Sequence, residues 1–323
     1  MDHLCELVHS LAISRPGSKW HNQCRSKFSK KSITSIRISP HRTNSDKEST
    51  LQPDITILDA HVHIHDCFDI SDFLDHAYDN FRLEAELYAE TDRFNCAILL
   101  TESFGTNWFN ALRQSESSSD DYSWKNWRIT TNDEAESLTA TSRSGQELSV
   151  VAGRQIVTAE NLEILAIGLD AVIDDGLPID EVIRKVQASD ALCVLPWGFG
   201  KWIGRRGQIV RDVLSSDLGS SFFIGDNAGR LALWPEPVEF KTAARRNVRI
   251  LPGSDPLPYK SQVSSVGRFG LVLDRGIDIS RPFRELRRLL LDEDSILQPY
   301  GSLERLLPFI RYQIGMQLRK FVA

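Results

Sequence analysis

The sequence predicts an α/β fold, in which a barrel of strands and helices begins near residue 54. From there, short apolar runs alternate with polar stretches of helical length, the pattern of βα units around a parallel sheet. The 323 residues suffice for one such barrel, which usually holds about 200 to 250 residues in one core. The first apolar run also ends in the polar motif DAHVHIHD (59–66), at the strand end where barrels carry functional side chains.

The predicted strands are apolar runs of strand length, several of which end in polar or glycine-bearing turns. They cover residues 55–64, 95–101, 148–157, 164–170, 191–197, 221–227 and 248–255. The helices predicted between them cover residues 70–93, 179–188, 205–216 and 236–246. Pro178 and Pro235 stand near two of the helix starts, where a missing N–H costs little.

Three segments fall outside this alternation, which leaves residues 54–280 for the barrel. Residues 1–53 are rich in Ser, Lys, Arg and His, and we expect them to form a disordered basic extension. An organellar transit peptide is the less favoured interpretation. Residues 108–147 are polar and turn-rich, which predicts an insertion on the barrel surface. Residues 281–323 contain amphipathic helices, whose Leu and Ile stripes are expected to pack on the barrel.

Composition and charge argue against several classes of protein. The hydrophobic content of 41% and the charged content of 25% are ordinary for a globular protein with a sizeable interior. A net charge of −6 makes nucleic acid an unlikely partner, because phosphate binding needs a concentrated positive field. No run approaches the roughly 20 apolar residues of a membrane span, and no secretory signal is recognised, so we expect a cytoplasmic protein without membrane contact. The five cysteines contain no CxxC pair, which argues against a zinc knuckle.

The motif DAHVHIHD carries the clearest chemical signal. Strand alternation places Asp59, His61, His63 and His65 on one side of the strand, and two imidazoles at positions i and i+2 can reach one metal ion. For an isolated HxH pair a structural role would be the simpler interpretation. This pair, however, ends the first barrel strand, where the active sites of barrels are built. The motif therefore predicts a metal site.

Several motifs, taken in order over about residues 55–275, resemble those of the PHP (polymerase and histidinol phosphatase) domain family. The amidohydrolases are a more distant relative that shares the DxHxH opening. The matching segments are DAHVH (59–63), AILLTES (97–103), VAGRQIVTAENLEILAIG (151–168), ALCVLPWG (191–198) and LPGSDPL (251–257). They are similar to the first PHP motif, the strand that ends in Thr-Asp-His, the Gly-x-Glu strand with its hairpin, the strand that ends in His-Pro, and the closing Gly-Ser-Asp-Ala-His. This resemblance implies a PHP-like distorted (β/α)7 barrel.

The sequence departs from the family pattern in the metal cage, where the resemblance implies up to three ions held by histidines and carboxylates. No histidine follows His76. The family's metal-binding positions are occupied here by Glu102, Ser103, Gln155, Leu195 and Leu257. Two of the three metal positions are therefore expected to be lost or weakened.

One metal centre remains after these losses. By the resemblance it consists of His61, His63 and Asp255, with Gln155 as a weak neutral oxygen donor. Two neutral imidazoles and a carboxylate are a competent ligand set for zinc, manganese or iron, and three protein ligands leave positions open for water. We therefore expect one divalent metal ion, or none if the site has decayed further.

Carboxylates near this centre are the candidates for a general base. Asp59, Asp66 and Glu102 are the first choices, and Glu163 and Asp226 are more remote ones. Each of them has a simpler alternative role, either as a group that orients a metal ligand or as a helix cap.

Two glycine-containing stretches supply cations for an anionic substrate. PWGFGKWIGRRG (196–207) places Lys201, Arg205 and Arg206 just past a strand end, and GDNAGR (225–230) adds Arg230. Glycines allow close backbone approach to a ligand, and arginine can bind phosphate or carboxylate through two hydrogen bonds. Solvated loops and ordinary turns explain the same residues equally well.

These features lead to the hypothesis of a PHP-type metal-dependent hydrolase, specifically a phosphoesterase with a reduced, mononuclear site and a small anionic, phosphorylated substrate. The alternative is a catalytically degenerate PHP-like barrel that acts as a binding or regulatory module, because the later histidines are missing. A second alternative is an amidohydrolase that cleaves a C–N bond, which usually needs later histidines and a lysine. The oligomeric state is left open.

Overall fold

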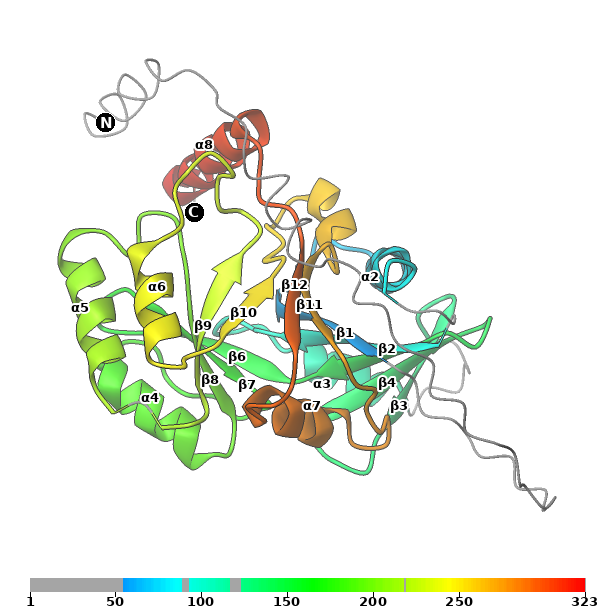
Figure 1. Cartoon of the computed structure of the whole chain (residues 1–323). Helices are drawn as coiled ribbons and strands as arrows, with labels where there is room; N and C mark the ends of the chain where they lie inside the picture. Colours follow the sequence, from blue (N-terminus) through cyan, green and yellow to red (C-terminus); the bar gives the residue numbers. More distant parts are fainter. Residues whose placement is uncertain (1–54, 89–92, 117–122, 218, 323) are drawn as a thin grey trace, which may run out of the picture. The chain divides into compact units, whose positions relative to one another are not determined.

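The computed structural model describes residues 55–88, 93–116, 123–217 and 219–322 (Figure 1). The predicted extension 1–53 lies outside the described residues. The strands are β1 (Ile55–Val62), β2 (Phe94–Leu100), β3 (Trp127–Thr131), β4 (Ser137–Ser142), β5 (Glu147–Val151), β6 (Gly153–Val157), β7 (Glu163–Ile167), β8 (Leu192–Pro196), β9 (Phe222–Asn227), β10 (Ile250–Gly253), β11 (Phe269–Leu273) and β12 (Leu297–Gly301). The helices are α2 (Ile70–Ala85), α3 (Trp108–Ser115), α4 (Ile179–Ala188), α5 (Gly204–Ser215), α6 (Val238–Arg245), the 3-10 helix η2 (Lys260–Ser265), α7 (Pro282–Leu291) and α8 (Leu306–Val322).

These strands form two mixed sheets. The order is β12-β11-β1-β2-β5-β4-β3 in the seven-stranded sheet and β10-β9-β8-β7-β6 in the five-stranded sheet. The neighbours β1, β2 and β5 run parallel, as do β8, β9 and β10, and the other pairs are antiparallel. The prediction of an α/β fold is confirmed. The described strands do not close into one continuous barrel, however, so the predicted barrel is corrected to two sheets.

The two sheets meet at two hydrogen-bonded seams. At the first seam, the Glu102 N–H, just after β2, donates to the Gly153 carbonyl of β6 at 2.9 Å, and the Gln155 N–H donates to the Glu102 carbonyl at 2.9 Å. At the second seam, the Asp255 N–H, just after β10, donates to the His61 carbonyl of β1 at 2.8 Å. The residues that resemble metal-binding motifs therefore lie where the sheets meet.

A glycine occupies each seam because the backbones approach closely there. A Cβ added at Gly153 would overlap the Leu100 carbonyl oxygen, and a Cβ added at Gly253 would overlap the backbone of His61. Backbone atoms cannot move away as the end of a flexible side chain can. Both seams therefore depend on the missing side chain.

One predicted strand proved to be two. Residues 148–157 were predicted as a single strand, but Ala152 separates β5 of the seven-stranded sheet from β6 of the five-stranded sheet. The segment 108–147 contains α3, β3 and β4, and its two strands extend the seven-stranded sheet beyond β5. The C-terminal segment holds α7 and α8 with β12 between them.

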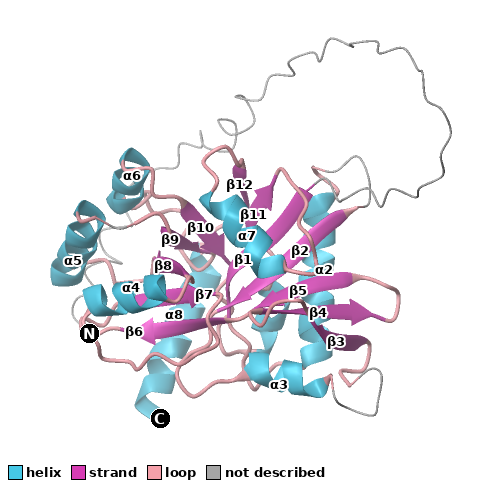
Figure 2. Cartoon of the chain, turned by 90° about the horizontal axis from the view of Figure 1, so that it is seen from below, coloured by secondary structure: helices cyan, strands magenta, loops and turns pink. Residues whose placement is uncertain are grey.

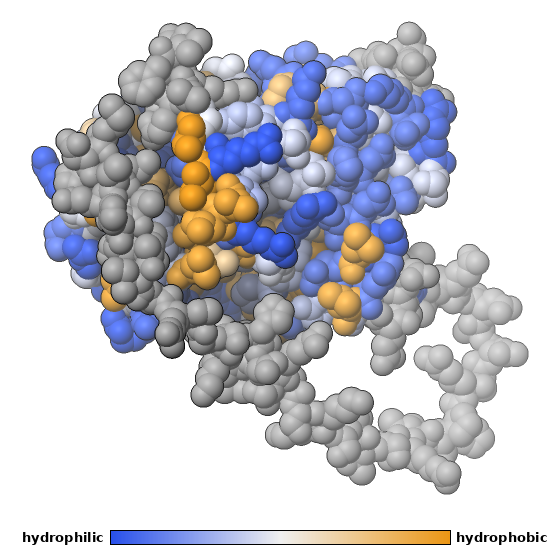
Figure 3. Space-filling model, turned by 90° about the horizontal axis from the view of Figure 1, so that it is seen from above, coloured by the Kyte–Doolittle hydropathy of each residue, from blue (hydrophilic) through white to orange (hydrophobic). Residues whose placement is uncertain are grey.

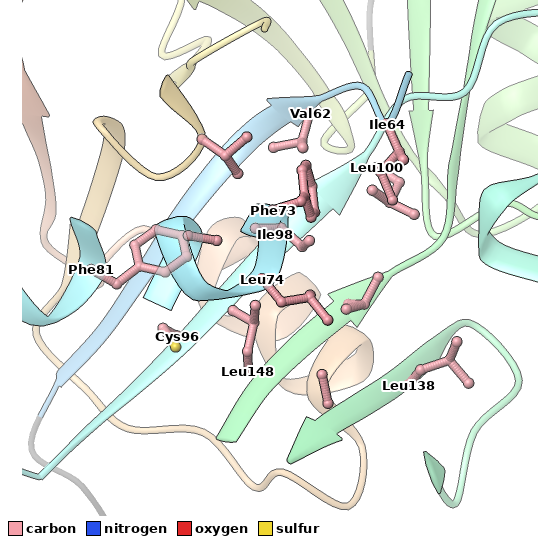
Figure 4. Close-up of a cluster of buried hydrophobic side chains, with 14 of the residues drawn as sticks. Val62, Ile64, Phe73, Leu74, Phe81, Cys96, Ile98, Leu100, Leu138 and Leu148 are labelled. Atoms are coloured by element: carbon pink, nitrogen blue, oxygen red, sulfur yellow. The ribbon is translucent and has the colours of Figure 1, made fainter. Parts of the chain in front are cut away.

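Strand alternation separates the core into layers. Ile57 of β1 packs with the side chains under α2, whereas its neighbour Leu58 packs in an inner cluster that also contains residues of β2, β7, β8, β9, β10, β11 and α7. Figure 4 shows Phe73, Leu74 and Phe81 of α2 over the strands of the seven-stranded sheet. Helices α4, α5 and α6 cover the outer face of the five-stranded sheet (Figure 2).

Helix α8 lies at the opposite end of the strands from α7 (Figure 1). Among the α8 side chains that the structure describes, which end at residue 316, four apolar ones are exposed, and a group of apolar side chains is visible on the face seen in Figure 3. The four are Leu306, Leu307, Ile310 and Ile314. Of the helices that are described, α8 included, none has the length and apolar character needed to cross a membrane.

Candidate metal centre

Two histidines at the end of β1 form the base of the candidate centre. His61 and His63 are separated by one residue, so the alternation of the extended chain turns both side chains to the same side. Both are buried, and their Nε2 atoms lie 3.1 Å apart. This is the length of an N–H···N hydrogen bond when one ring carries the proton, and it is also short enough for both nitrogens to face one ion.

Asp255 completes the group from the other sheet. It follows β10 in the left-handed region, with φ of 46°, which aspartate tolerates better than most residues. Its Oδ1 lies 3.6 Å from the Nε2 of His61 and 3.5 Å from the Nε2 of His63. His61, His63 and Asp255 are thus a group that could hold a metal ion.

The three ligand atoms, Nε2 of His61, Nε2 of His63 and Oδ1 of Asp255, form a triangle whose dimensions suit a small divalent ion. Ligand atoms about 2.0 to 2.1 Å from a tetrahedral zinc ion lie about 3.3 Å from one another. The three separations here are 3.1, 3.5 and 3.6 Å. The residues present therefore fit a single ion with three protein ligands, without requiring a large movement of any of them.

The protonation states of the group also suit a metal ion. Burial, assisted by the neighbouring His61, lowers the pKa of His63 to about 3, so its imidazole is neutral at neutral pH. Burial alone would raise the pKa of Asp255, but the imidazoles of His61 and His63 and the Asn227 amide more than offset it and leave that pKa lowered. A neutral imidazole and an ionised carboxylate are the forms that bind metal.

A cleft of about 720 Å³ opens over this group. His63, Asp255 and Gln155 line it. The rest of the lining contains the carboxylates of Glu163 and Glu304, together with cations, neutral polar groups and aromatic rings. These include Lys201, Arg268, Arg305, Ser261, Ser264, Ser265, Gln262, Trp197, Phe199, Phe309 and Tyr312. The size is within the range of typical ligand sites.

The three first candidates for a general base lie away from the lining of this cleft. Asp66 is exposed beyond the end of β1. Glu102 is buried and accepts hydrogen bonds from the N–H groups of Trp108 and Phe109, the latter at 3.1 Å, so it caps α3. It also forms an ion pair with Arg154 at 3.2 Å. Burial raises the pKa of Glu102, although Arg154 opposes this shift.

Asp59, the remaining candidate base, is fully buried between three segments of the chain. Its Oδ1 accepts from the Ser254 N–H at 2.8 Å and from the His61 N–H at 3.3 Å, and its Oδ2 accepts from the Gly267 N–H at 2.9 Å. Burial raises its pKa from 3.8 to about 6, in spite of these hydrogen bonds. Asp59 therefore links β1 to the segments that flank β10 and β11.

This raised pKa predicts a pH dependence of stability. The folded chain favours protonated Asp59, so this contribution is fully present below a pH of about 4 and is lost as the pH rises through about 6. In chelator, the unfolding free energy of the wild type minus that of Asp59→Asn should fall by up to about 3 kcal/mol between pH 4 and 7. Urea unfolding across this range measures it. A difference that stays constant with pH would show that the Asp59 pKa is unshifted.

Most of the cations predicted to bind substrate are engaged within the chain. Lys201 lines the cleft and forms an ion pair with Glu163, which also lines it. Arg206 donates to the Gly200 carbonyl at 2.8 Å, and Arg205 is exposed outside the cleft lining. Arg230 is buried against Asp226, with two hydrogen bonds of 2.9 and 2.7 Å.

Some cleft residues had no signal in the sequence. Phe309 and Tyr312 of α8 line the cleft, and Phe309 packs edge-on against Phe199 with ring centroids 5.2 Å apart. Their helical spacing is equally typical of core packing, so periodicity could not separate the two roles. Arg268 and Arg305 are isolated cations in the sequence, and only the fold brings them to the cleft.

No family model matches the sequence. Cytosolic glucose-6-phosphate isomerase of Arabidopsis thaliana is 28% identical over 157 residues, which cover 45% of this chain and 27% of that protein. Cytosolic glucose-6-phosphate isomerase B of Oryza sativa subsp. japonica is 28% identical over 130 residues, which cover 36% and 21%. The matches thus span about a quarter of the length of these curated relatives.

Solved structures with a similar arrangement include PsfC from Pseudomonas syringae PB-5123, with a TM-score of 0.47, 12% identity, and coverage of 84% of this chain and 100% of that chain. The lesion-specific endonuclease PfuEndoQ from Pyrococcus furiosus has a TM-score of 0.46 and 11% identity, with coverage of 75% and 57%. Endonuclease Q in complex with a 27-mer duplex substrate that carries an abasic lesion has a TM-score of 0.41 and 14% identity, with coverage of 73% and 56%.

The predicted partner needs correction. The sequence predicts a small phosphorylated substrate and makes nucleic acid unlikely, whereas endonuclease Q was solved with a duplex substrate. The physical reason for the error is that the net charge of −6 is a sum over the whole chain, while phosphate binding depends on the local field. Lys201, Arg268 and Arg305 line one cleft despite that net charge. The restriction to small substrates is therefore withdrawn.

Proposed function

We propose that this chain is a divergent PHP-like, metal-dependent hydrolase with a single divalent ion bound by His61, His63 and Asp255. The observation that carries the proposal is the triangle of two Nε2 atoms and one carboxylate oxygen below a cleft of ligand size. The two-sheet arrangement with hydrogen-bonded seams supports a distorted PHP-like barrel in preference to a regular one.

The chemistry of such a site divides between the ion and the chain. A bound divalent ion would polarise a substrate oxygen and lower the pKa of water towards neutrality. The chain would orient the substrate and move protons. Among the carboxylates considered as bases, Glu163 lies in the cleft lining, and its partner Lys201 lies beside it. We propose Glu163 for the proton transfer and zinc, manganese or iron for the ion.

We propose a phosphodiester of nucleic acid as the substrate class. Lys201, Arg268 and Arg305 line the cleft, and since Lys201 is paired with Glu163, Arg268 and Arg305 are the cations offered to a phosphate backbone. Serine and glutamine side chains in the lining can donate to phosphate oxygens without adding charge. Cleavage of a phosphodiester would use the same water activation as other metal-dependent hydrolases.

The alternative is a PHP-like barrel that binds a ligand without catalysis. It is favoured by the pairing of Glu102 with Arg154 and by Leu195 and Leu257 at positions where the family has histidines. An amidohydrolase is less favoured, because the sequence has no histidine after His76.

Metal content is the first prediction to test. We expect about one divalent ion per chain in protein purified without an affinity tag or chelator, measured by elemental mass spectrometry. We also expect metal-dependent cleavage of fluorescent single-stranded and duplex oligonucleotides. Protein that takes up no zinc, manganese or iron, even after incubation with each, would contradict the proposed centre. Bound metal without cleavage would favour the binding module.

A further inference from the structure

Asn227 contacts the candidate metal centre through the carboxylate of Asp255. It is the last residue of β9, it is buried, and it pairs in register with Gly253 of β10, two residues before Asp255. Its side-chain NH2 donates to Oδ2 of Asp255. In the sequence, Asn227 belongs to the motif GDNAGR (225–230), which is consistent with a residue that lines the pocket and equally with an ordinary turn.

The orientation of the Asn227 amide is fixed by a second hydrogen bond. Its Oδ1 accepts from the Gly229 N–H at 2.6 Å. A flipped amide would place the NH2 group against that N–H and the oxygen against a carboxylate, so both contacts would become repulsive. The hydrogen-bond donor of Asn227 therefore faces Asp255 in the only arrangement that satisfies both ends.

This contact determines which oxygen Asp255 presents. Because Oδ2 is engaged by Asn227, Oδ1 is the oxygen that faces the Nε2 atoms of His61 and His63, at 3.6 and 3.5 Å. The backbone of Asp255 is held as well, by its N–H to the His61 carbonyl. Asp255 is thus held at two points, at its backbone by His61 and at its carboxylate by Asn227.

We propose that Asn227 is the positioning residue of the metal centre, which holds Asp255 so that it offers one oxygen to the ion. The inference rests on the proposed function for its metal, but the positioning itself is a property of the chain. Outer groups of this kind fix the orientation of ligands, and their loss typically weakens metal binding by about 10 to 100-fold.

The first test uses metal-free protein, so it is independent of the proposed activity. The imidazole nitrogen resonances of His61 and His63 report on the carboxylate that faces them. We expect Asn227→Ala to shift both sets, because Asp255 becomes free to rotate. Asn95→Ala is the matched control, since Asn95 is also buried and accepts from a backbone N–H, that of Ile277, at 2.8 Å. Unchanged His61 and His63 resonances in Asn227→Ala would overturn the inference, whether or not the wild type binds metal.

A second comparison separates positioning from packing. Asn227→Asp keeps the shape of the side chain and the acceptor for Gly229, but it replaces the donor to Asp255 with an oxygen. We expect Asn227→Asp to lower the melting temperature of the metal-free protein more than Asn227→Ala does. A residue that only fills space would give the reverse order, because alanine removes more atoms.

A measurement of metal binding then connects the inference to the proposed function. With zinc alone as the probe, we expect Asn227→Ala to bind at least about 10-fold more weakly than the wild type, and Asn95→Ala to bind like the wild type. Equal affinity of Asn227→Ala and the wild type would contradict the positioning role. A wild type that binds no zinc, manganese or iron would instead count against the proposed function, and the histidine resonances would still decide the role of Asn227.

Discussion

Replacement of His61 by alanine should remove the bound metal and any turnover that depends on it. His61 supplies one of the three ligand atoms of the candidate centre, at 3.1 Å from the Nε2 of His63. Loss of an outer group costs about 10 to 100-fold in metal affinity, so loss of a direct ligand from a set of three should cost more than about 100-fold. The measurements are elemental mass spectrometry and a zinc titration of the variant and the wild type.

His76→Ala is the control for this experiment. His76 is an exposed histidine on α2, and its removal should leave metal content and turnover unchanged. Circular dichroism should show that both variants keep their secondary structure. Turnover by His61→Ala at the wild-type rate would contradict the proposed mechanism, and metal retained by this variant would place the ion elsewhere.

Replacement of Gly253 by alanine should destabilise the chain and disturb the metal centre together. The added methyl group would overlap the backbone of His61, at the seam that joins β10 to β1. Overpacking of an interior typically costs about 1 to 3 kcal/mol, and a clash with backbone atoms belongs at the upper end, so we expect about 3 kcal/mol or more. Urea unfolding measures this loss, and a zinc titration measures the accompanying loss of affinity.

Gly198→Ala is the matched glycine variant. A Cβ at Gly198 would meet the aliphatic stem of Lys201, with the nearest atom at 2.8 Å, and this flexible side chain can move away. We expect a change in unfolding free energy of less than about 1 kcal/mol there. Equal destabilisation by the two substitutions would show that the second seam is not the tight contact described above.

Many strands and helices were predictable from the sequence, but β3, β4, β11 and β12 were missed, and the way the strands close into sheets was not predictable. The β1 run and the α4 helix follow local periodicity, which the sequence displays directly. The break at Ala152 between β5 and β6 falls next to Gly153, but a glycine inside a strand-like run does not show that its two halves pair in different sheets. The two halves differ in their partners: β5 pairs with β2, which is distant in the sequence, whereas β6 pairs with β7, the next strand along the chain. The two-sheet arrangement depends on such distant pairings.

The candidate site shows the same limit. His61, His63 and Asp255 were predictable because ordered motifs carried them. The partners of the charged residues were not, since Arg154 lies 52 positions from Glu102 and no pattern in the sequence pairs them. Once the fold is known, Arg154 and the α3 N–H groups account for Glu102 without any catalytic role.

Because the metal ligands lie at a seam, the metal centre is complete only while the two sheets are joined. His61 lies in β1 of the seven-stranded sheet and His63 directly follows that strand, while Asp255 follows a strand of the five-stranded sheet. A form in which the sheets separate would lose the ligand set as a whole, so an ion bound there would favour the joined form through mass action. The concentration of free metal around the protein would then set the fraction of molecules that keep the two sheets together. The supply of the ion would thereby control how much folded protein is present, as well as whether the site can react.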